Sequence, residues 1–367
     1  MGGYFFFTDT VDVIFGCKMH SYPLRGTKHF RSQSIKMRCT ISYIGSKRKI
    51  AGRIWELIAE RWDDMGNFTL VDAFYGAGNI TRILGGNFRD VVLNDMETYS
   101  YLVACAMYSP ALQLPESIEP IDGYVTQSYS PAGKDGRMFF TKENAMLIDG
   151  YREWLKKQPP SQQRDAAVGT LICSLDKVAN TTSVYGAYLK FFKKEAEKKM
   201  AITSYAQSNL SGKVSFKRGD AVAACLDATD DSFLYLDPPY TGVAYSNNFF
   251  VLNVIGNIDS DPELYGVTGR PTGMFKSNWN NRERALGELC KILKDTPARR
   301  VGLSYSTDGL MPVNRIMEAF EGLDWDVTLH RIPQKRYSTH PPGTVVTNTK
   351  ILEELFFLAE RKKKTTI

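Results

Sequence analysis

The chain has 367 residues, 43% of them apolar and 12% aromatic, which is enough for two or three domains around a large core. Its 46 Lys and Arg against 40 Asp and Glu give a net charge of +6, and no apolar run approaches the roughly 18 residues that a membrane span needs. No Lys or Arg precedes Cys17 to begin a secretory signal, and the six cysteines form no CxxC pair, so secretion, membrane residence, a disulfide framework and a zinc site are disfavoured. We expect free thiols and a cytoplasmic protein.

The amino-terminal region, residues 1–39, shows no amphipathic period. An aromatic start gives way to a basic stretch, and Met37 stands just before the first periodic segment. We expect a poorly ordered extension, with Met37 as a candidate start of translation. From Ser46, a candidate N-cap, apolar residues recur at helix spacing as far as Trp62, which predicts a helix of about four turns.

A β-loop-α-β unit follows this helix. Thr69–Phe74 predicts a strand, the glycine loop Tyr75–Gly78 leads into a helix, and Val91–Leu93 predicts a second buried strand that ends at Asp95. A unit of this kind begins a parallel sheet.

The segment from about 97 to 211 has a mostly helical pattern without strand alternation. Its main predicted helices are Lys142–Lys157, Asp165–Ala179 and Tyr188–Met200. Strand signals then return, with helices at about 281–294 and 313–321 between some of them. The later predicted strands are Val214–Phe216, Phe233–Leu236, Val301–Ser304, Trp325–Leu329 and Leu355–Leu358. The predicted fold class is α/β, with a sheet split by a mainly helical insertion.

Two polar groups belong to the β-loop-α-β unit. The loop Asp72–Gly78 lies where a strand meets a helix, and its glycines let the backbone approach a ligand. Thr81 replaces the third glycine of a dinucleotide fingerprint, and no Gly-Lys-Ser/Thr is present, so NAD and ATP are disfavoured. Asp95 is placed to accept hydrogen bonds from ribose hydroxyls. A nucleotide-like cofactor is implied, with a purely structural turn as the alternative.

The sharpest motif is Asp237–Tyr240, Asp-Pro-Pro-Tyr, which follows the apolar strand Phe233–Leu236. Two prolines fix the backbone and remove two N–H donors, which leaves carbonyl oxygens beside a carboxylate and an aromatic ring. Such a site suits the exocyclic amine of a planar base, although a proline-rich turn is the alternative. Gly219–Asp220 supplies a further carboxylate at the same edge of the sheet.

These motifs occur together in a fixed order. Tyr43–Lys47, Asp72–Gly78, Asn94–Asp95, Gly219–Asp220 and the Asp237–Tyr240 box follow one another along the chain. In this arrangement the chain resembles the Dam-like class of DNA adenine-N6 methyltransferases, restriction-modification methylases included. The resemblance implies a Rossmann-like S-adenosylmethionine-dependent methyltransferase sheet that is split by a target-recognition insertion.

The resemblance also implies roles for individual residues. S-adenosylmethionine would be held by Tyr43, Lys47, Asp72, Phe74, Gly76, Gly78, Asp95 and Asp220. Among these, Tyr43 and Lys47 would meet the methionine end and Asp220 the adenine amine. The catalytic residues would be Asp237, Pro238, Pro239 and Tyr240. Tyr75 departs from the pattern, because such methylases more often have Ser there.

The implied reaction is methyl transfer to N6 of an adenine that is flipped out of duplex DNA. Asp237 and the Pro238 carbonyl would accept the amine's hydrogen bonds, and Tyr240 would stack on the base, with no metal required. Phosphates would be contacted from one face of the predicted helix Tyr188–Met200. Its lysines for this role are Lys190, Lys193, Lys194 and Lys198. Candidates for reading bases are Asn180, Arg270, Lys276 and Asn278.

The predicted organisation has four parts. They are the extension 1–39, a catalytic domain of 40–105 plus 212–360, a helical target-recognition insertion of 106–211, and a basic tail of 361–367. The expected partner is double-stranded DNA. We expect the protein to bind it as a monomer, in the cytoplasm of a bacterium or of the host cell of a phage or virus. A cognate restriction endonuclease acting separately is compatible with this. Open alternatives are methylation of RNA adenine, cytosine N4 or a glutamine amide, and a non-catalytic DNA-binding relative.

Overall fold

The computed structural model describes residues 41–43, 45–206, 210, 212–334 and 352–363. The predictions for the extension 1–39 and for Met37 lie outside the described residues, as does most of the basic tail. Four cysteines within the described part, Cys105, Cys173, Cys225 and Cys290, are free thiols. None of the helices described there combines the length and the apolar character that crossing a membrane takes.

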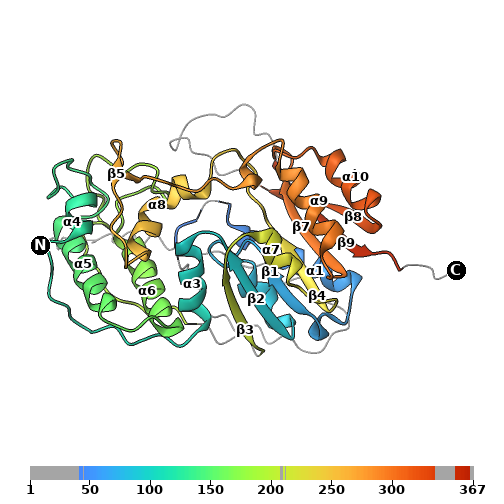
Figure 1. Ribbon diagram of the computed structural model, residues 1–367, viewed down its shortest axis with the longest axis horizontal. Coiled ribbons are helices and arrows are strands. Elements are labelled where there is room, and N and C mark those ends of the chain that lie inside the picture. Colours follow the sequence, from blue (N-terminus) through green and yellow to red (C-terminus); the bar gives the residue numbers. More distant parts are fainter. Residues whose placement is uncertain (1–40, 44, 207–209, 211, 335–351, 364–367) are drawn as a thin grey trace, which may run out of the picture. The chain divides into compact units, whose positions relative to one another are not determined.

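A seven-stranded sheet forms the framework, with strand order β3-β2-β1-β4-β7-β9-β8 (Figure 1). Its strands are β1 Thr69–Asp72, β2 Asp90–Asp95, β3 Val214–Arg218, β4 Ser232–Leu236, β7 Arg300–Ser306, β8 Trp325–Gln334 and β9 Leu352–Arg361. Neighbouring strands are parallel except around β9, which runs antiparallel to both β7 and β8. The α/β, Rossmann-like fold class is therefore confirmed, and the chain between β2 and β3 contains the mainly helical segment.

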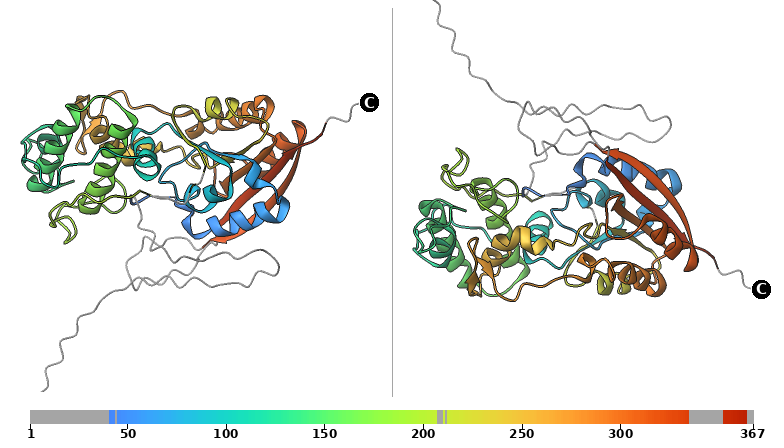
Figure 2. Two further views of the ribbon diagram at one scale, coloured as in Figure 1. Left: turned by 90° about the horizontal axis from the view of Figure 1, so that it is seen from below. Right: turned by 90° about the horizontal axis from the view of Figure 1, so that it is seen from above.

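Helices cover both faces of this sheet (Figure 2). The α-helices are α1 Ala51–Arg61, α2 Thr81–Leu84, α3 Thr98–Tyr108, α4 Tyr124–Tyr129, α5 Lys142–Lys156, α6 Gln162–Leu175, α7 Ala221–Leu226, α8 Tyr245–Gly256, α9 Ala285–Asp295 and α10 Val313–Gly322. Short 3-10 helices are η1 Lys47–Lys49, η2 Met65–Asn67, η3 Gly85–Asn87, η4 Asp176–Val178 and η5 Asn278–Asn280, and β5 Leu264–Tyr265 pairs with β6 Arg270–Pro271.

Alternation along the strands divides the interior into two cores. On one face Leu70 and Phe233 pack with α1 and α3, and on the other Val71 and Leu234 pack with α7, α9 and α10. Because successive strand residues point to opposite faces, strands buried on both sides read as continuous apolar runs. That pattern is what made the strands predictable.

The inserted helices are completed by a segment that follows the Asp237–Tyr240 box. No helix was predicted there, but α8 forms, and the chain beyond it returns to α4 and α5. Arg152 pairs with Asp261 at 2.8 Å, and Tyr129 donates to the Gly269 carbonyl at 3.0 Å. α8 was missed because it is apolar on nearly all sides, so it shows no amphipathic period.

The predicted helix Tyr188–Met200 is wrong, because this segment consists of bends and turns. Two buried asparagines donate hydrogen bonds to backbone carbonyl groups that a helix would use for its own hydrogen bonds. Asn180 Nδ2 donates to the carbonyls of Leu189 and Phe191, and Asn144 Nδ2 donates to the carbonyls of Ala196 and Lys198. Tertiary hydrogen bonds therefore override the local helical pattern.

Candidate active site

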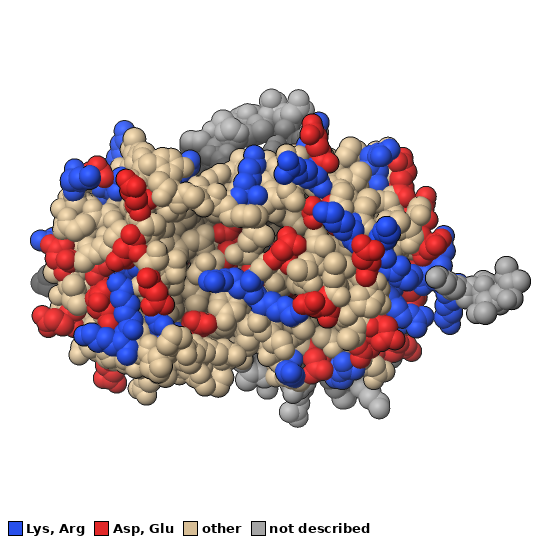
Figure 3. Space-filling model, viewed as in Figure 1, with Lys and Arg blue, Asp and Glu red and all other residues tan. Residues whose placement is uncertain are grey.

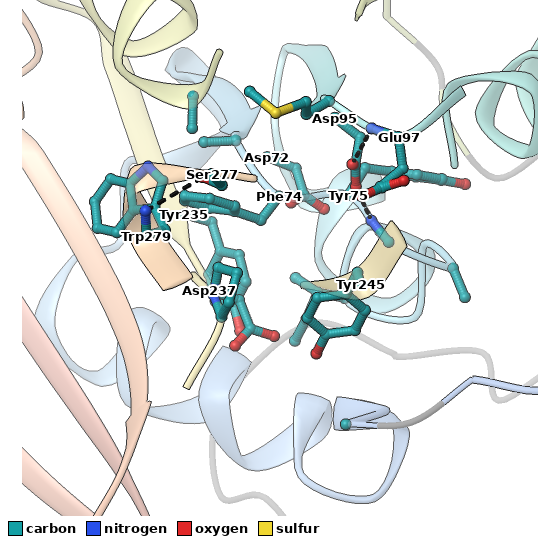
Figure 4. A pocket seen from close by; sticks show the side chains of 18 of the residues that line it. Asp72, Phe74, Tyr75, Asp95, Glu97, Tyr235, Asp237, Tyr245, Ser277 and Trp279 are labelled. Carbon is teal, nitrogen blue, oxygen red and sulfur yellow. Dashed lines mark hydrogen bonds between the residues drawn. The ribbon is translucent and has the colours of Figure 1, made fainter. Parts of the chain in front are cut away.

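A pocket opens at the carboxyl ends of β1, β2 and β4, where side chains from separate segments meet (Figure 4). The empty space among its lining residues is about 880 Å³, open solvent included. Of the predicted cofactor residues, Tyr43, Lys47, Asp72, Phe74, Gly76, Asp95 and Asp220 line it, whereas Gly78 does not. Asp237 and Pro239 of the predicted catalytic box also line it, whereas Pro238 and Tyr240 do not. The motifs that the sequence separates therefore come together.

The glycine loop is held by Asp95. Gly76 has a φ of +57°, and its N–H donates to Asp95 Oδ2 at 2.8 Å. Ser100 Oγ donates to the same oxygen, and the Glu97 N–H donates to Oδ1. Burial raises the pKa of Asp95, although these hydrogen bonds oppose the shift. Asp95 thus shapes the loop and also lines the pocket.

Asp72 contributes a buried carboxyl group with an unused oxygen. Its side chain is 1% exposed, and Thr81 Oγ1 donates to Oδ2 at 2.6 Å. Oδ1 has no hydrogen-bond partner among the described residues. Burial raises the pKa of Asp72 to about 7. A cationic ligand would supply the missing partner and favour the ionised carboxylate.

Aromatic side chains form two walls of the pocket. Tyr43 stacks on Tyr245 with ring centroids 5.5 Å apart, and Phe74 meets Trp279 edge-on at 5.2 Å. Tyr75, the departure from the family pattern, turns inward and is 4% exposed. Such walls suit a planar heterocycle and the apolar parts of a ligand.

Asp220 stands at the start of α7 and caps that helix. Its Oδ1 accepts hydrogen bonds from the N–H groups of Val222 and Ala223. Asp220 is exposed and lines the pocket, where an exocyclic amine could donate to its carboxylate.

The catalytic box is joined to an ion-pair cluster. Lys47 Nζ lies 3.1 Å from Asp237 Oδ1 and 3.3 Å from Glu354 Oε1, and 4.5 Å from the centre of the Tyr240 ring. Tyr240 Oη lies 2.6 Å from Asp237 Oδ1. Burial lowers the pKa of Lys47, but the charges of Asp237 and Glu354 outweigh it and the net shift is upward. Lys47 therefore contacts the carboxylate of the predicted catalytic box directly.

Several residues at or beside the pocket were missed by sequence reasoning. Glu97, Tyr245 and Trp279 line the pocket, and Glu354 reaches the box from β9. Burial raises the pKa of Glu97 to about 7, and Asn253 donates a hydrogen bond to it. One signal was available for Glu354, since a carboxylate directly before the apolar run Leu355–Leu358 is unusual in a buried strand.

The residues predicted to contact DNA are scattered. Lys190, Lys194 and Lys198 are exposed, but they share no helix face, and Lys193 Nζ donates to the Thr181 carbonyl at 2.8 Å. Figure 3 shows Lys and Arg mixed with Asp and Glu on the face in view. No single basic stripe is visible on that face.

The four candidates for base reading differ in burial and in hydrogen bonding. Asn180 is fully buried and occupied by backbone hydrogen bonds, so its prediction is wrong. Asn278 donates to Glu288 at 2.9 Å, whereas Lys276 is exposed. Arg270 is half-buried on β6. Lys276 and Asn278 are thus the two exposed candidates.

Comparison with known proteins gives consistent matches. Residues 43–283 match the family of D12 class N6 adenine-specific DNA methyltransferases. The type II methyltransferase M.CviAII of Paramecium bursaria Chlorella virus 1 is 35% identical over 287 residues, which cover 74% of this chain and 85% of the relative. The type II methyltransferase M.NlaIII of Neisseria lactamica is 30% identical over 77% of this chain and 88% of the relative. The matched family range contains the glycine loop and the catalytic box and ends before β9.

Proposed function

Because the chain belongs to the D12 class of N6 adenine-specific DNA methyltransferases, we propose that it moves a methyl group from S-adenosylmethionine to N6 of an adenine flipped out of duplex DNA. The resemblance to Dam-like adenine methylases is confirmed by the same matches. The relatives point to a restriction-modification system as the source of the activity. The main support for this mechanism is that Asp237 lines the same pocket as Asp72 and Asp95.

The residues around the pocket fit the proposed cofactor. S-adenosylmethionine carries a sulfonium and an ammonium group, and Asp72 Oδ1 is a buried acceptor that lacks a partner. Asp95 would take the ribose hydroxyls, Asp220 the adenine amine, and the aromatic walls the planar ring. Tyr43 and Lys47 would meet the methionine end, and Phe74, Gly76 and Gly78 would form the loop, where φ values of +57° at Gly76 and +72° at Gly78 favour glycine. When bound, the cofactor supplies an electrophilic methyl group on sulfur.

The catalytic box acts on the amine of the base. The lone pair of that amine is delocalised into the ring, which makes the nitrogen a poor nucleophile. Asp237 and the Pro238 carbonyl would accept its two N–H groups and favour a pyramidal nitrogen, and Pro239 would fix that backbone. Asp237 also stabilises the positive charge that develops on nitrogen in the transition state.

The experiment that tests this function is transfer of a labelled methyl group from S-adenosylmethionine to unmethylated DNA, followed by nucleoside analysis. N6-methyladenine is the expected product. N4-methylcytosine, or label in RNA alone, would replace the proposed substrate by one of the alternatives. Absence of both transfer and cofactor binding would favour a non-catalytic DNA-binding protein.

We expect Tyr240→Ala to weaken capture of the flipped base more than binding of the cofactor. The ring is the proposed stacking partner, and stacking of a base on an aromatic side chain is worth about 1 to 3 kcal/mol. Fluorescence of 2-aminopurine at the target position measures flipping, and a cofactor titration gives the second constant. Tyr240→Phe is the matched control because it keeps the ring. Equal losses in both constants for Tyr240→Ala would contradict the assignment.

The lysines of the segment 190–198 give a prediction on salt dependence. The DNA-binding constant falls as salt rises. Each phosphate contact that is lost makes the slope of log binding constant against log salt concentration shallower by about 1. We expect this change for Lys190→Ala, Lys194→Ala and Lys198→Ala, with Lys291→Ala on α9 as the control. Lys193→Ala should instead lower thermal stability, since Lys193 holds the Thr181 carbonyl. Unchanged slopes in all three variants would exclude this segment from the DNA interface.

The wider organisation is part of the proposal. We place catalysis in residues 40–105 plus 212–360 and target recognition in 106–211, assisted by α8 and the β5–β6 hairpin that pack on the inserted helices. The enzyme would act as a monomer on double-stranded DNA in the cytoplasm of a bacterium or of a virus's host, and a cognate restriction endonuclease would act separately.

A further inference from the structure

Four side chains from three separate segments meet beside the pocket. Lys47 comes from η1, Asp237 and Tyr240 follow β4, and Glu354 lies on β9. Lys47 Nζ and Tyr240 Oη both lie within 3.3 Å of Asp237 Oδ1 and of Glu354 Oε1. The two carboxylate oxygens are therefore bridged twice, once by an ammonium and once by a hydroxyl group.

The hydrogen count of this cluster points to a shared proton. A tyrosine hydroxyl has one proton, so Tyr240 can donate to only one of the two carboxylates at a time. The second short contact is favourable when the other carboxyl group is protonated and donates to Tyr240 Oη. Glu354 is the more buried partner, with a side chain 6% exposed against 20% for Asp237. The proton is therefore expected on Glu354, and burial raises its pKa to about 7.

The cluster also decides which oxygen of Asp237 is available. Lys47 and Tyr240 both occupy Oδ1. Within the part of the chain that the structure describes, no hydrogen-bond donor contacts Oδ2. Oδ2 is thus left for a ligand in the pocket that Asp237 lines.

We propose that Glu354 is a positioning residue for methyl transfer, which holds Lys47 and Tyr240 against Asp237 and sets the net charge beside the reacting amine. This role rests on the proposed function. In the transfer, the nitrogen lone pair forms the bond to the methyl carbon, the carbon–sulfur bond breaks with its electron pair on sulfur, and the cationic nitrogen then releases its proton to solvent water. Lys47, Asp237 and ionised Glu354 together carry one negative charge, which stabilises that cationic nitrogen. With Glu354 protonated the cluster is neutral and this stabilisation is smaller.

The titratable groups that face Glu354 are few. They are Lys47, Asp237, Tyr240 and, from β4, Tyr235. Its register partners on the neighbouring strands are Ser306 and Ile332, which carry no charge. Asp72 and Glu97 titrate in the same range, but both stay in place when only Glu354 is changed.

The test is the pH dependence of kcat, at saturating cofactor and DNA, for the wild type and Glu354→Gln. We expect the wild-type rate to rise through a step near pH 7, the value about which Glu354 titrates. Glu354→Gln keeps the shape but cannot ionise, so the step attributable to Glu354 should vanish. At high pH its rate should be about 10-fold or more below that of wild type. This is the effect expected from losing one negative charge near the reacting nitrogen. Cofactor affinity should change less than kcat.

The matched control is Glu353→Gln, the same substitution one residue earlier on β9. Glu353 pairs with Arg331 on the solvent side, so its loss should leave the pH profile unchanged. A Glu354→Gln enzyme that keeps the step, whether at full or uniformly reduced rate, would overturn the proposal. If that variant does not fold, Glu354→Asp decides: a displaced step supports the role, and an unmoved step overturns it. A wild type that transfers no methyl group to adenine would overturn the proposed function itself, and this role with it.

Discussion

Asp237→Ala is expected to reduce methyl transfer close to background, a loss on the order of 10³-fold in kcat. In the proposed reaction, Asp237 is the carboxylate that both receives the amine and faces the charge developing on nitrogen. Lys47 keeps Glu354 as a partner at 3.3 Å, so the variant should fold. The measurement is labelled transfer to DNA, with thermal unfolding and separate titrations of DNA and cofactor.

The control for this variant is Asp230→Ala, because Asp230 is an exposed aspartate before the opposite end of β4. Transfer by the control should match the wild type. DNA and cofactor should still bind to Asp237→Ala, since neither depends on this carboxylate alone. Substantial residual turnover by Asp237→Ala would contradict the catalytic assignment.

The second large effect concerns stability. Asp72 has a folded-state pKa of about 7 against an ordinary 3.8, because burial disfavours its ionised form. Between these values the folded chain binds more protons than the unfolded chain, so this group makes stability fall as pH rises from about 4 to about 7 and leaves it level above. Asp72→Asn removes that loss. We expect the variant to be more stable than wild type at about pH 8, on the order of 3 kcal/mol, and little different at about pH 4.

Function should move in the opposite direction for Asp72→Asn. An amide cannot supply the negative charge that a sulfonium or ammonium group would meet at Oδ1, so cofactor affinity should fall as stability rises. Thermal unfolding at several pH values, with and without cofactor, measures both effects. Glu97 and Glu354 are unchanged in the variant, so their titration cancels in the comparison. A variant that is less stable than wild type at about pH 8 would refute the account of Asp72 as a destabilising buried charge.

The parts of the site that could be predicted are those written into short stretches of chain. The glycine loop follows β1 and Asp237–Tyr240 follows β4, so each is fixed by the residues beside it. Parallel strands bring their carboxyl ends to one edge, which is why these separate motifs meet in a pocket. The helix at Lys142–Lys156 was equally predictable, since Thr141 caps it and one face is apolar.

Other predictions failed where distant residues took over the backbone. The segment 188–200 has the composition of a helix, but Asn144 and Asn180 bind its carbonyl groups. α8 showed no periodicity because it is buried on nearly all sides. A local pattern reports the exposure of one helix face. α8 has no such face, and in the segment 188–200 tertiary hydrogen bonds override the pattern.

The sequence by itself determined the α/β class, the family and the order of the cofactor and catalytic motifs, because these depend on apolar strands and on contiguous residues. Only the tertiary structure placed Glu354 against Tyr240, which stands 114 positions earlier in the chain. That contact depends on β9 pairing antiparallel to β7 in one register, with Glu354 opposite Ser306. Strand register is set by packing across the whole sheet, and a shift of one residue would turn Glu354 to the other face.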